Sequence, residues 1–136
     1  MIIDGSKSGR AIGGYKDLIA WQKSMDLVVA VYKVSAGFPR EERFGLTSQV
    51  RRAAVSVPSN IAEGYSRPSS LDYQRYLDIA RGSANETETQ LIAASRLRMA
   101  PADELASVIN LTNEVQRILK GLVDSVGRSN KGNYRR

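Results

Sequence analysis

Apolar residues recur every three or four positions in four separate segments of this 136-residue chain. That spacing places them along one side of an α-helix, whereas a half-buried strand requires strict alternation. The four segments cover about residues 16–37, 46–66, 70–99 and 102–127. Short connections between helices favour antiparallel neighbours. The sequence therefore predicts an all-α fold, an antiparallel up-down-up-down four-helix bundle.

Glycine, proline and serine mark the boundaries of the predicted helices. Phe38-Pro39 after a glycine ends the first helix, because proline bars its continuation. Ser69 or Ser70 is the candidate cap for the third helix, and Gly127 is expected to end the fourth. Pro58 lies inside the second apolar stripe, which continues in phase on both sides of it. We therefore expect one helix there, bent at the proline.

The net charge of +6 lies at the two ends of the chain. Residues 128–136 contain four basic residues and no acidic one, and residues 1–16 contain three basic residues and one acidic residue. The intervening segment, 17–127, therefore carries no net charge. Composition divides the chain into three parts: a glycine-rich, flexible N-terminal arm (1–14), the four-helix bundle (15–128) and a basic C-terminal tail (129–136).

The chain contains neither cysteine nor histidine. It therefore lacks thiol chemistry, the commonest metal ligands and the usual general base near neutral pH. Glu86 and Glu88 do not form the Glu-x-x-His motif of di-iron bundles, and no glycine-rich phosphate loop occurs. No apolar run has the length of a membrane span, and the N-terminus does not read as a secretory signal. We expect a cytoplasmic protein that is not an enzyme and holds no metal or cofactor.

Polar residues form rows on the second and third predicted helices. One interpretation is that these are the solvated faces of amphipathic helices. The other is a contact between helices or between subunits, which Gly82 favours because a mid-helix glycine costs about 1 kcal/mol unless something packs closely on it. The candidates for oligomer contacts are Gln49, Arg52, Ser56, Pro58, Asn60, Glu63, Gly82, Ser83 and Glu86.

Basic residues are the candidates for nucleic-acid contact. The tail is basic and contains one aromatic residue, which suits nucleic-acid binding, but it also suits a disordered, solubilising tail. The alternative surface is on the bundle, where Arg81 joins other arginines and where Arg51 and Arg52 are expected to pair with nearby glutamates. The candidate residues are Lys131, Arg135, Arg136, Arg128, Arg51, Arg52 and Arg75.

The segment from Leu46 to Gly64, LTSQVRRAAVSVPSNIAEG, closely resembles the signature of the four-helix-bundle proteins encoded in bacterial 23S rRNA intervening sequences. Other landmarks also match: Trp21-Gln22-Lys23, Phe38-Pro39, and Ile79-Ala80-Arg81-Gly82-Ser83 with Glu86 and Glu88. The likeness covers about residues 15–126. That family is similar in fold to the accessory variability proteins of diversity-generating retroelements, which resemble pentameric barrels that bind nucleic acid and partner a reverse transcriptase.

The resemblance implies a homopentamer with the second and third helices at or near the subunit contacts. Our first hypothesis is a non-enzymatic, oligomeric protein that binds nucleic acid, RNA in particular. The second is a protein-interaction scaffold, or an accessory subunit of a reverse transcriptase. An enzyme acting on RNA is disfavoured, because the chain offers neither a histidine base nor histidine or cysteine metal ligands.

Overall fold

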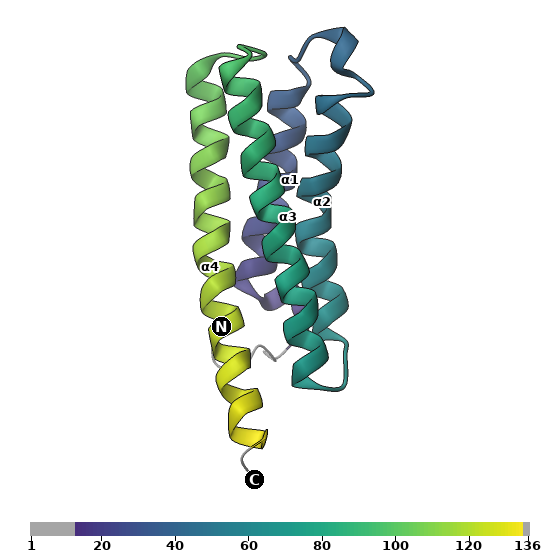
Figure 1. Ribbon diagram of the computed structural model, residues 1–136, viewed down its shortest axis with the longest axis vertical. Helices are drawn as coiled ribbons and strands as arrows, with labels where there is room; N and C mark the ends of the chain where they lie inside the picture. The colour runs from purple at the N-terminus through teal and green to yellow at the C-terminus, as the bar shows by residue number, and fades with distance from the viewer. Residues whose placement is uncertain (1–12, 135–136) are drawn as a thin grey trace.

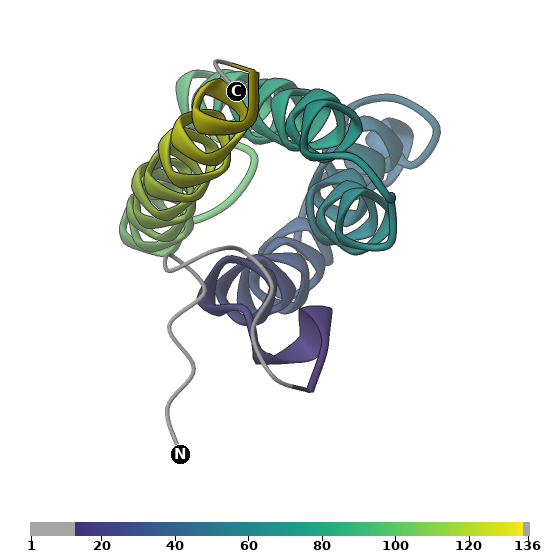
Figure 2. The same ribbon diagram turned by 90° about the horizontal axis from the view of Figure 1, so that it is seen from below.

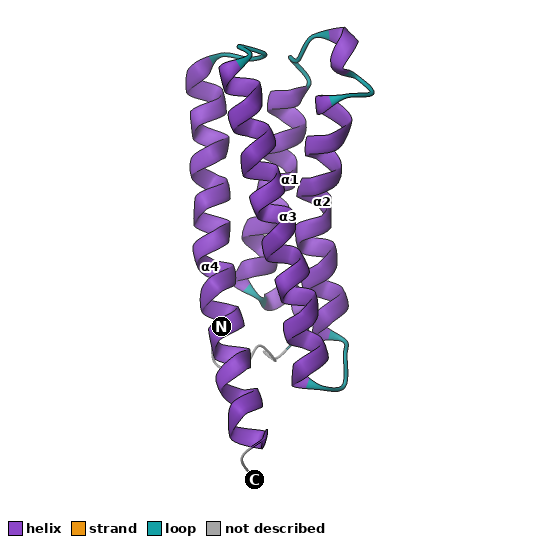
Figure 3. Ribbon diagram, viewed as in Figure 1, coloured by secondary structure: helices purple, strands orange, loops and turns teal. Residues whose placement is uncertain are grey.

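The computed structural model describes residues 13–134, with side chains as far as residue 128, and its main elements are four long helices (Figure 1). These are α1 (Ile19–Ser35), α2 (Leu46–Tyr65), α3 (Ser70–Arg96) and α4 (Ala102–Tyr134). Short 3-10 helices, Tyr15–Asp17 and Arg40–Glu42, precede α1 and α2. No strand occurs within residues 13–134, and the all-α prediction is confirmed (Figure 3). Almost all of the predicted N-terminal arm lies outside the described residues.

The four helices lie side by side around one core (Figure 2). Both α1 and α3 pack against α2 and α4, so that α1 and α3 lie on the diagonal of the bundle. Polar contacts fix the register of α2 against α3: Gln49 meets Gln90, and Ser56 meets Ser83. Residue numbers thus rise along α2 as they fall along α3.

The predicted apolar stripes of α2, α3 and α4 supply most of the core, whereas α1 buries Leu27, Val31 and Val34 and leaves the regularly spaced Met25 and Tyr32 exposed. On α3, every residue of the predicted inward face is buried: Tyr73, Leu77, Ala80, Ala84, Leu91 and Ala94. The stripe of α4 is buried in the same way, from Leu105 to Val126. Trp21 is half-buried against the core, with its ring edge-on to Tyr15 at 5.6 Å. The bundle therefore buries one apolar side of each helix, which is the main favourable term in its folding.

Local signals located several helix boundaries correctly. The Ser69 hydroxyl accepts a hydrogen bond from the Asp72 backbone N–H at 3.1 Å, so of the two candidate serines it is Ser69 that caps α3. The second helix is continuous through the buried Pro58. The third helix ends at Arg96, before the predicted position near residue 99, and Arg98 follows in a left-handed conformation with φ 55°.

The end predicted for the fourth helix is wrong. Helix α4 continues through Gly127 to Tyr134, so most of the segment assigned to the tail is helical. Residue 127 still packs against α3, since a Cβ there would lie 3.0 Å from the Gln74 Nε2. No proline follows to stop the helix, and a single interior glycine is tolerated at a cost of about 1 kcal/mol.

Gly64 lies at a close approach of α2 and α3. It is buried in the last turn of α2. A Cβ at this position would lie 2.7 Å from the Tyr76 Cβ and 3.1 Å from the Tyr73 Cδ1. Any side chain here would force the two helices apart or displace the tyrosines, and Tyr73 belongs to the buried core. The absence of a side chain at 64 is therefore a packing requirement.

We predict that Gly64→Ala lowers the free energy of unfolding by about 1–2 kcal/mol, because overpacking costs about 1–3 kcal/mol and the helix-propensity gain offsets part of it. Gly121→Ala is the matched control, since a Cβ at that α4 position meets nothing within 4 Å. The control should be neutral or stabilising. Denaturant unfolding followed by circular dichroism measures both, and equal stability of the two variants would contradict the packing role of Gly64.

Candidate nucleic-acid interface

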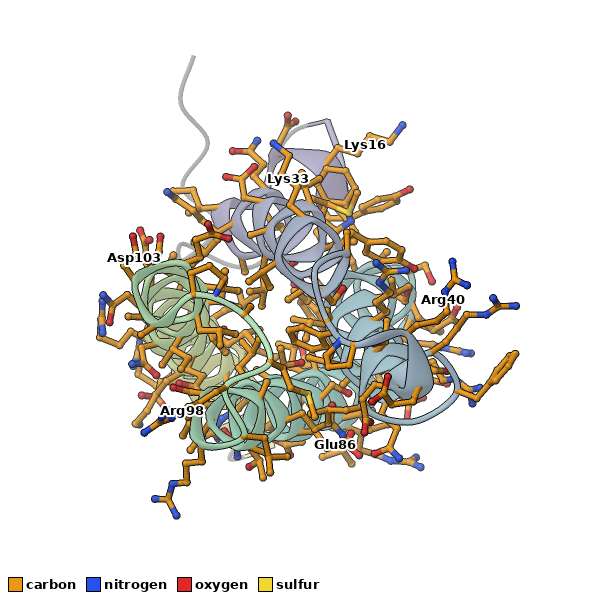
Figure 4. All side chains as sticks on the ribbon, turned by 90° about the horizontal axis from the view of Figure 1, so that it is seen from above. Lys16, Lys33, Arg40, Glu86, Arg98 and Asp103 are labelled. Atoms are coloured by element: carbon orange, nitrogen blue, oxygen red, sulfur yellow. The ribbon has the colours of Figure 1, made fainter. Side chains whose placement is uncertain are left out.

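The polar rows predicted on the second and third helices meet along a groove between α2 and α3. This α2/α3 groove has a volume of about 470 Å³ and is lined by Phe44, Ser48, Gln49, Arg52, Ala53, Ser56, Glu86 and Gln90. Figure 4 shows Glu86 on the side of the bundle where these helices meet. The structure therefore brings together four of the residues that we named as oligomer-contact candidates: Gln49, Arg52, Ser56 and Glu86.

Hydrogen bonds inside the chain engage the middle of these rows. The hydroxyls of Ser56 and Ser83 lie 2.8 Å apart, and Ser83 is buried. The Asn60 amide donates to the Ser56 hydroxyl at 2.9 Å and to the Ser56 carbonyl at 2.8 Å. The Ser56–Ser83 contact joins α2 to α3 within one chain, the Asn60 bonds lie within α2, and Pro58 is buried. The candidates whose side chains or positions remain exposed are Gln49, Arg52, Glu63, Gly82 and Glu86.

The glutamates do not pair with Arg51 or Arg52 as the sequence suggested. Glu63 forms an ion pair with Arg67, four residues further along the chain. Arg67 also donates to the Tyr76 hydroxyl at 2.9 Å. Glu88 accepts a hydrogen bond from an α4 glutamine, Gln116, at 3.0 Å. The expected pairing is therefore wrong: Glu63 and Glu88 have other partners, and Glu86 lines the same groove as Arg52 without forming an ion pair with it.

Arg51 and Arg52 are adjacent in sequence but differ in their contacts. The Arg51 guanidinium donates to the Ser35 hydroxyl at 2.8 Å and to the Tyr32 carbonyl at 3.2 Å, and it lies 4.5 Å from the centre of the Tyr32 ring. It thus places a cation over the carbonyl end of α1. Arg52 is exposed and makes no hydrogen bond or ion pair with any other described residue. Only Arg52 of the two is available to an external ligand.

The remaining predicted contact residues lie at different places. Arg75 pairs with Asp72 at 3.3 Å on the exposed side of α3. Arg128 is exposed on α4. Lys131 belongs to the last turns of α4, with its side chain outside the described part, and Arg135 and Arg136 lie beyond the described residues. Arg128 and Lys131 are one helical turn apart, at the end of α4 that extends past its neighbours (Figure 1).

A second polar groove, between α3 and α4, was missed by the sequence analysis apart from Arg81. The α3/α4 groove has a volume of about 380 Å³ and is lined by Arg81, Asn85, Asn113, Gln116, Arg117 and Lys120. Its α4 members continue a row at helical spacing through Asp124 to Arg128. Basic residues recur at helical spacing at positions 117, 120, 128 and 131, and this pattern in the sequence could have indicated a basic side of the fourth helix.

Asp124 is the one acidic residue in this row of α4. Its carboxylate accepts a hydrogen bond from the Lys120 ammonium at 2.9 Å. That bond, with the charges of Lys120, Arg128 and Arg81, lowers the pKa of the Asp124 carboxyl below its ordinary value. Cations from both α3 and α4 therefore act on the Asp124 carboxylate, whose side chain is about half exposed to solvent.

Apolar side chains are exposed on α1, in the connection to α2 and midway along α2, and Tyr32, Phe44 and Val55 line one shallow pocket. Met25, Val29 and Tyr32 recur on one side of α1, and Val55 lies on α2. Phe44, in the connection between them, is 86% exposed. We call these five residues the apolar face. Exposed apolar groups gathered in one area are typical of a surface that contacts another molecule.

Other kinds of site find no support in residues 13–134. In that part of the chain, no group of three or more acidic residues, histidines or cysteines is placed to hold a metal ion. None of its helices combines the length and the apolar character that crossing a membrane requires. The grooves and the apolar face are therefore the surfaces to explain.

The family model for the 23S rRNA-intervening sequence protein matches residues 16–121. The chain belongs to this family. The matched region contains α1, α2, α3 and most of α4, whereas the projecting end of α4 lies outside it. The resemblance drawn from the Leu46–Gly64 signature is thus confirmed.

A solved structure is similar to this member of the 23S rRNA-intervening sequence family. It is a protein of unknown function from the S23 ribosomal protein family of Bacteroides thetaiotaomicron, with 26% sequence identity and a TM-score of 0.70. The alignment covers 77% of this chain and 98% of that protein. Comparison with curated proteins finds no match.

We predict that Arg51→Met lowers the free energy of unfolding by about 1–2 kcal/mol, because it removes two hydrogen bonds made by a charged group while keeping the aliphatic stem. Arg52→Met, the adjacent control, should change stability by no more than about 0.5 kcal/mol. Chemical denaturation measures both variants. If they are equally stable, Arg51 does not stabilise the end of α1.

Proposed function

We propose that this antiparallel four-helix bundle is a non-enzymatic, oligomeric protein that binds nucleic acid, and that its ligand is RNA. The observation that carries the proposal is the projecting basic end of α4. Helix α4 has 33 residues and α2 has 20. At 1.5 Å per residue these are about 50 Å and about 30 Å long, and α4 extends past the ends of its neighbours (Figure 1).

The charge of this end is of one sign. Residues 128–136 contribute four basic residues and no acidic one, while residues 17–127 are neutral overall. Contacts between cations and phosphates supply most of the sequence-independent affinity for nucleic acids. RNA is the proposed ligand because the family is named for rRNA intervening sequences. A protein without histidine or cysteine also has few groups for catalysis, which supports a binding role.

We further propose that the chain assembles as a homopentamer, as its resemblance to pentameric barrels implies. The apolar face supports self-association, because burying Met25, Val29, Tyr32, Phe44 and Val55 removes apolar surface from water. Five copies would bring +30 formal charge together, from +6 for each chain. Modest contacts at each basic end would then sum to high affinity.

A ring needs a second, different surface on each copy, because its contacts are head-to-tail. The outer side of α3 is a candidate. Leu71 and Ile79 are 58% and 50% exposed there, and Gly82 follows at helical spacing. A Cβ at Gly82 would meet nothing within 4 Å in the same chain, so packing inside the bundle does not explain this glycine. The close approach of a neighbouring subunit would explain why a glycine is present at position 82.

The second candidate function is a protein-interaction scaffold, or an accessory subunit of a reverse transcriptase. The same apolar face favours it, since a protein partner could cover Phe44 and its neighbours in place of a second copy. The two functions differ in what the isolated protein does. A scaffold of this kind would bind RNA weakly or not at all until its partner is added, whereas a dedicated nucleic-acid-binding protein would bind RNA alone and with the salt dependence of phosphate contacts.

We predict that deleting residues 129–136 weakens binding to a single-stranded RNA and flattens its salt dependence. The deletion removes Lys131, Arg135 and Arg136, and each lost phosphate contact lowers the slope of log affinity against log salt by about 0.7. Fluorescence anisotropy across a KCl series measures affinity and slope together. Oligomeric mass should not change.

The matched variant keeps the chain length and replaces the same three residues by glutamine. It should bind as weakly as the deletion if charge carries the affinity. Lys33→Gln with Arg40→Gln removes two charges from another part of the bundle and should bind normally (Figure 4). Unchanged affinity and slope after the deletion would place RNA binding elsewhere on the protein.

We also predict that Gly82→Leu reduces the oligomeric mass while the isolated chain remains folded. The added side chain points into open space within one chain, so only a subunit contact can make it unfavourable. Gly121→Leu on α4 is the control, because that position is equally open. Light scattering after size exclusion measures mass, and circular dichroism checks folding. An unchanged mass for Gly82→Leu would remove α3 from the subunit contacts.

A further inference from the structure

The α3/α4 groove combines cations and amides in a way that neither tail binding nor oligomer contacts account for. Three of its six lining residues are basic: Arg81 from α3, and Arg117 and Lys120 from α4. The other three are amides, which donate hydrogen bonds without adding charge. Phosphate and sugar oxygens are recognised by these types of side chain.

Two of the three cations are free of partners in the described chain. Neither Arg81 nor Arg117 makes a hydrogen bond or ion pair with another described residue. Lys120 is held by Asp124 at 2.9 Å. A guanidinium with all its donors free can bind two oxygens of one phosphate at once. The groove therefore offers two cations, Arg81 and Arg117, that can bind a ligand directly. The third, Lys120, must first leave the Asp124 carboxylate.

Hydrogen bonds fix the position of two of the three amides, Asn85 and Gln116. The Gln116 amide donates to the Asn85 carbonyl oxygen at 3.0 Å and to the Glu88 carboxylate at 3.0 Å. Both N–H groups of Gln116 are thereby used, and the amino group of Asn85 is left to donate elsewhere. Asn85 thus stands beside Arg81 and Arg117 as an oriented donor in the groove.

The groove leads to the projecting end of α4. Residues 113, 117, 120, 124 and 128 follow one another at steps of three or four, which keeps them on one side of a helix. Arg117 and Arg128 are eleven residues apart, about 16 Å along the axis. The cations form an extended row, which suits a linear polyanion better than a single compact anion.

We propose that the phosphodiester backbone of a nucleic acid lies along the α3/α4 groove, contacting Arg81, Arg117 and Lys120, and continues to the basic end of α4. This rests on the proposed function and assigns residues of the folded bundle to it. Asp124 opposes binding, since it holds Lys120 and repels phosphate. Binding therefore requires Lys120 to leave Asp124 for a phosphate oxygen.

The first test neutralises the two free arginines in the full-length chain. Arg81→Gln with Arg117→Gln should weaken binding to a labelled single-stranded RNA about tenfold and lower the salt slope by about 0.7 for each cation removed. Lys33→Gln with Arg40→Gln, on α1 and on the 3-10 helix before α2, is the matched control and should bind normally (Figure 4). Circular dichroism and mass should be unchanged in both double variants.

The second test is a gain of affinity, which misfolding would not produce. Asp124→Asn removes the carboxylate that holds Lys120, so RNA should bind several-fold more tightly with a steeper salt dependence. If Lys120 and Asp124 form only a structural ion pair, the substitution should leave binding unchanged or weaken it. Polyglutamate serves as a second probe in each assay, and the groove variants should affect it less than RNA.

The outcomes separate the groove from the proposed function. If the arginine variant binds as the control does while the 129–136 deletion binds weakly, the groove assignment is wrong and RNA binding by the projecting end stands. If the unaltered protein shows no salt-dependent RNA binding, both fail. Equal binding of polyglutamate, with equal sensitivity to the variants, would reassign the groove to an acidic protein.

Discussion

The close contact of α2 with α3 is the constraint on which much of the bundle's architecture depends. The seam contains small residues on both helices, among them Ala53 and Gly64 on α2 and Ser83 on α3. Small side chains let the two backbones approach, and the core tyrosine Tyr73 then packs directly over Gly64. The serine pair at 56 and 83 fixes how far one helix slides along the other. That register in turn decides which polar residues face a neighbour and which face water.

Hydrophobic spacing was sufficient to predict the helices, because each one buries a continuous apolar side. The boundaries were harder where a residue has two uses. Gly127 reads as a helix end in a sequence, yet it packs beside Gln74 and the helix passes through it. Gly64 also resembles a helix-ending glycine in the sequence, but its main role is to let Tyr73 and Tyr76 of α3 pack closely against α2. Local sequence does not distinguish these uses, because the neighbour that decides between them lies on another helix.

The candidate site was predicted less completely for a related reason. The polar row on α2 was visible as a pattern, but its division into residues that bond to α3 and residues that face outward depends on the helix register. Arg51 and Arg52 illustrate this, since one contacts the end of α1 and its neighbour is exposed. The α3/α4 groove needs residues from two helices, and only the α4 half forms a pattern within one segment of sequence.

The overhang of α4 has a consequence for the shape of any cyclic assembly. Cyclic symmetry places every copy at the same height along the rotation axis. The overhanging ends would therefore form a single circle of positive charge, and the two sides of the particle would differ. A long polyanion would meet one side preferentially and could follow the circle from copy to copy. Such a particle has a direction, so it would also orient whatever is bound on its opposite side.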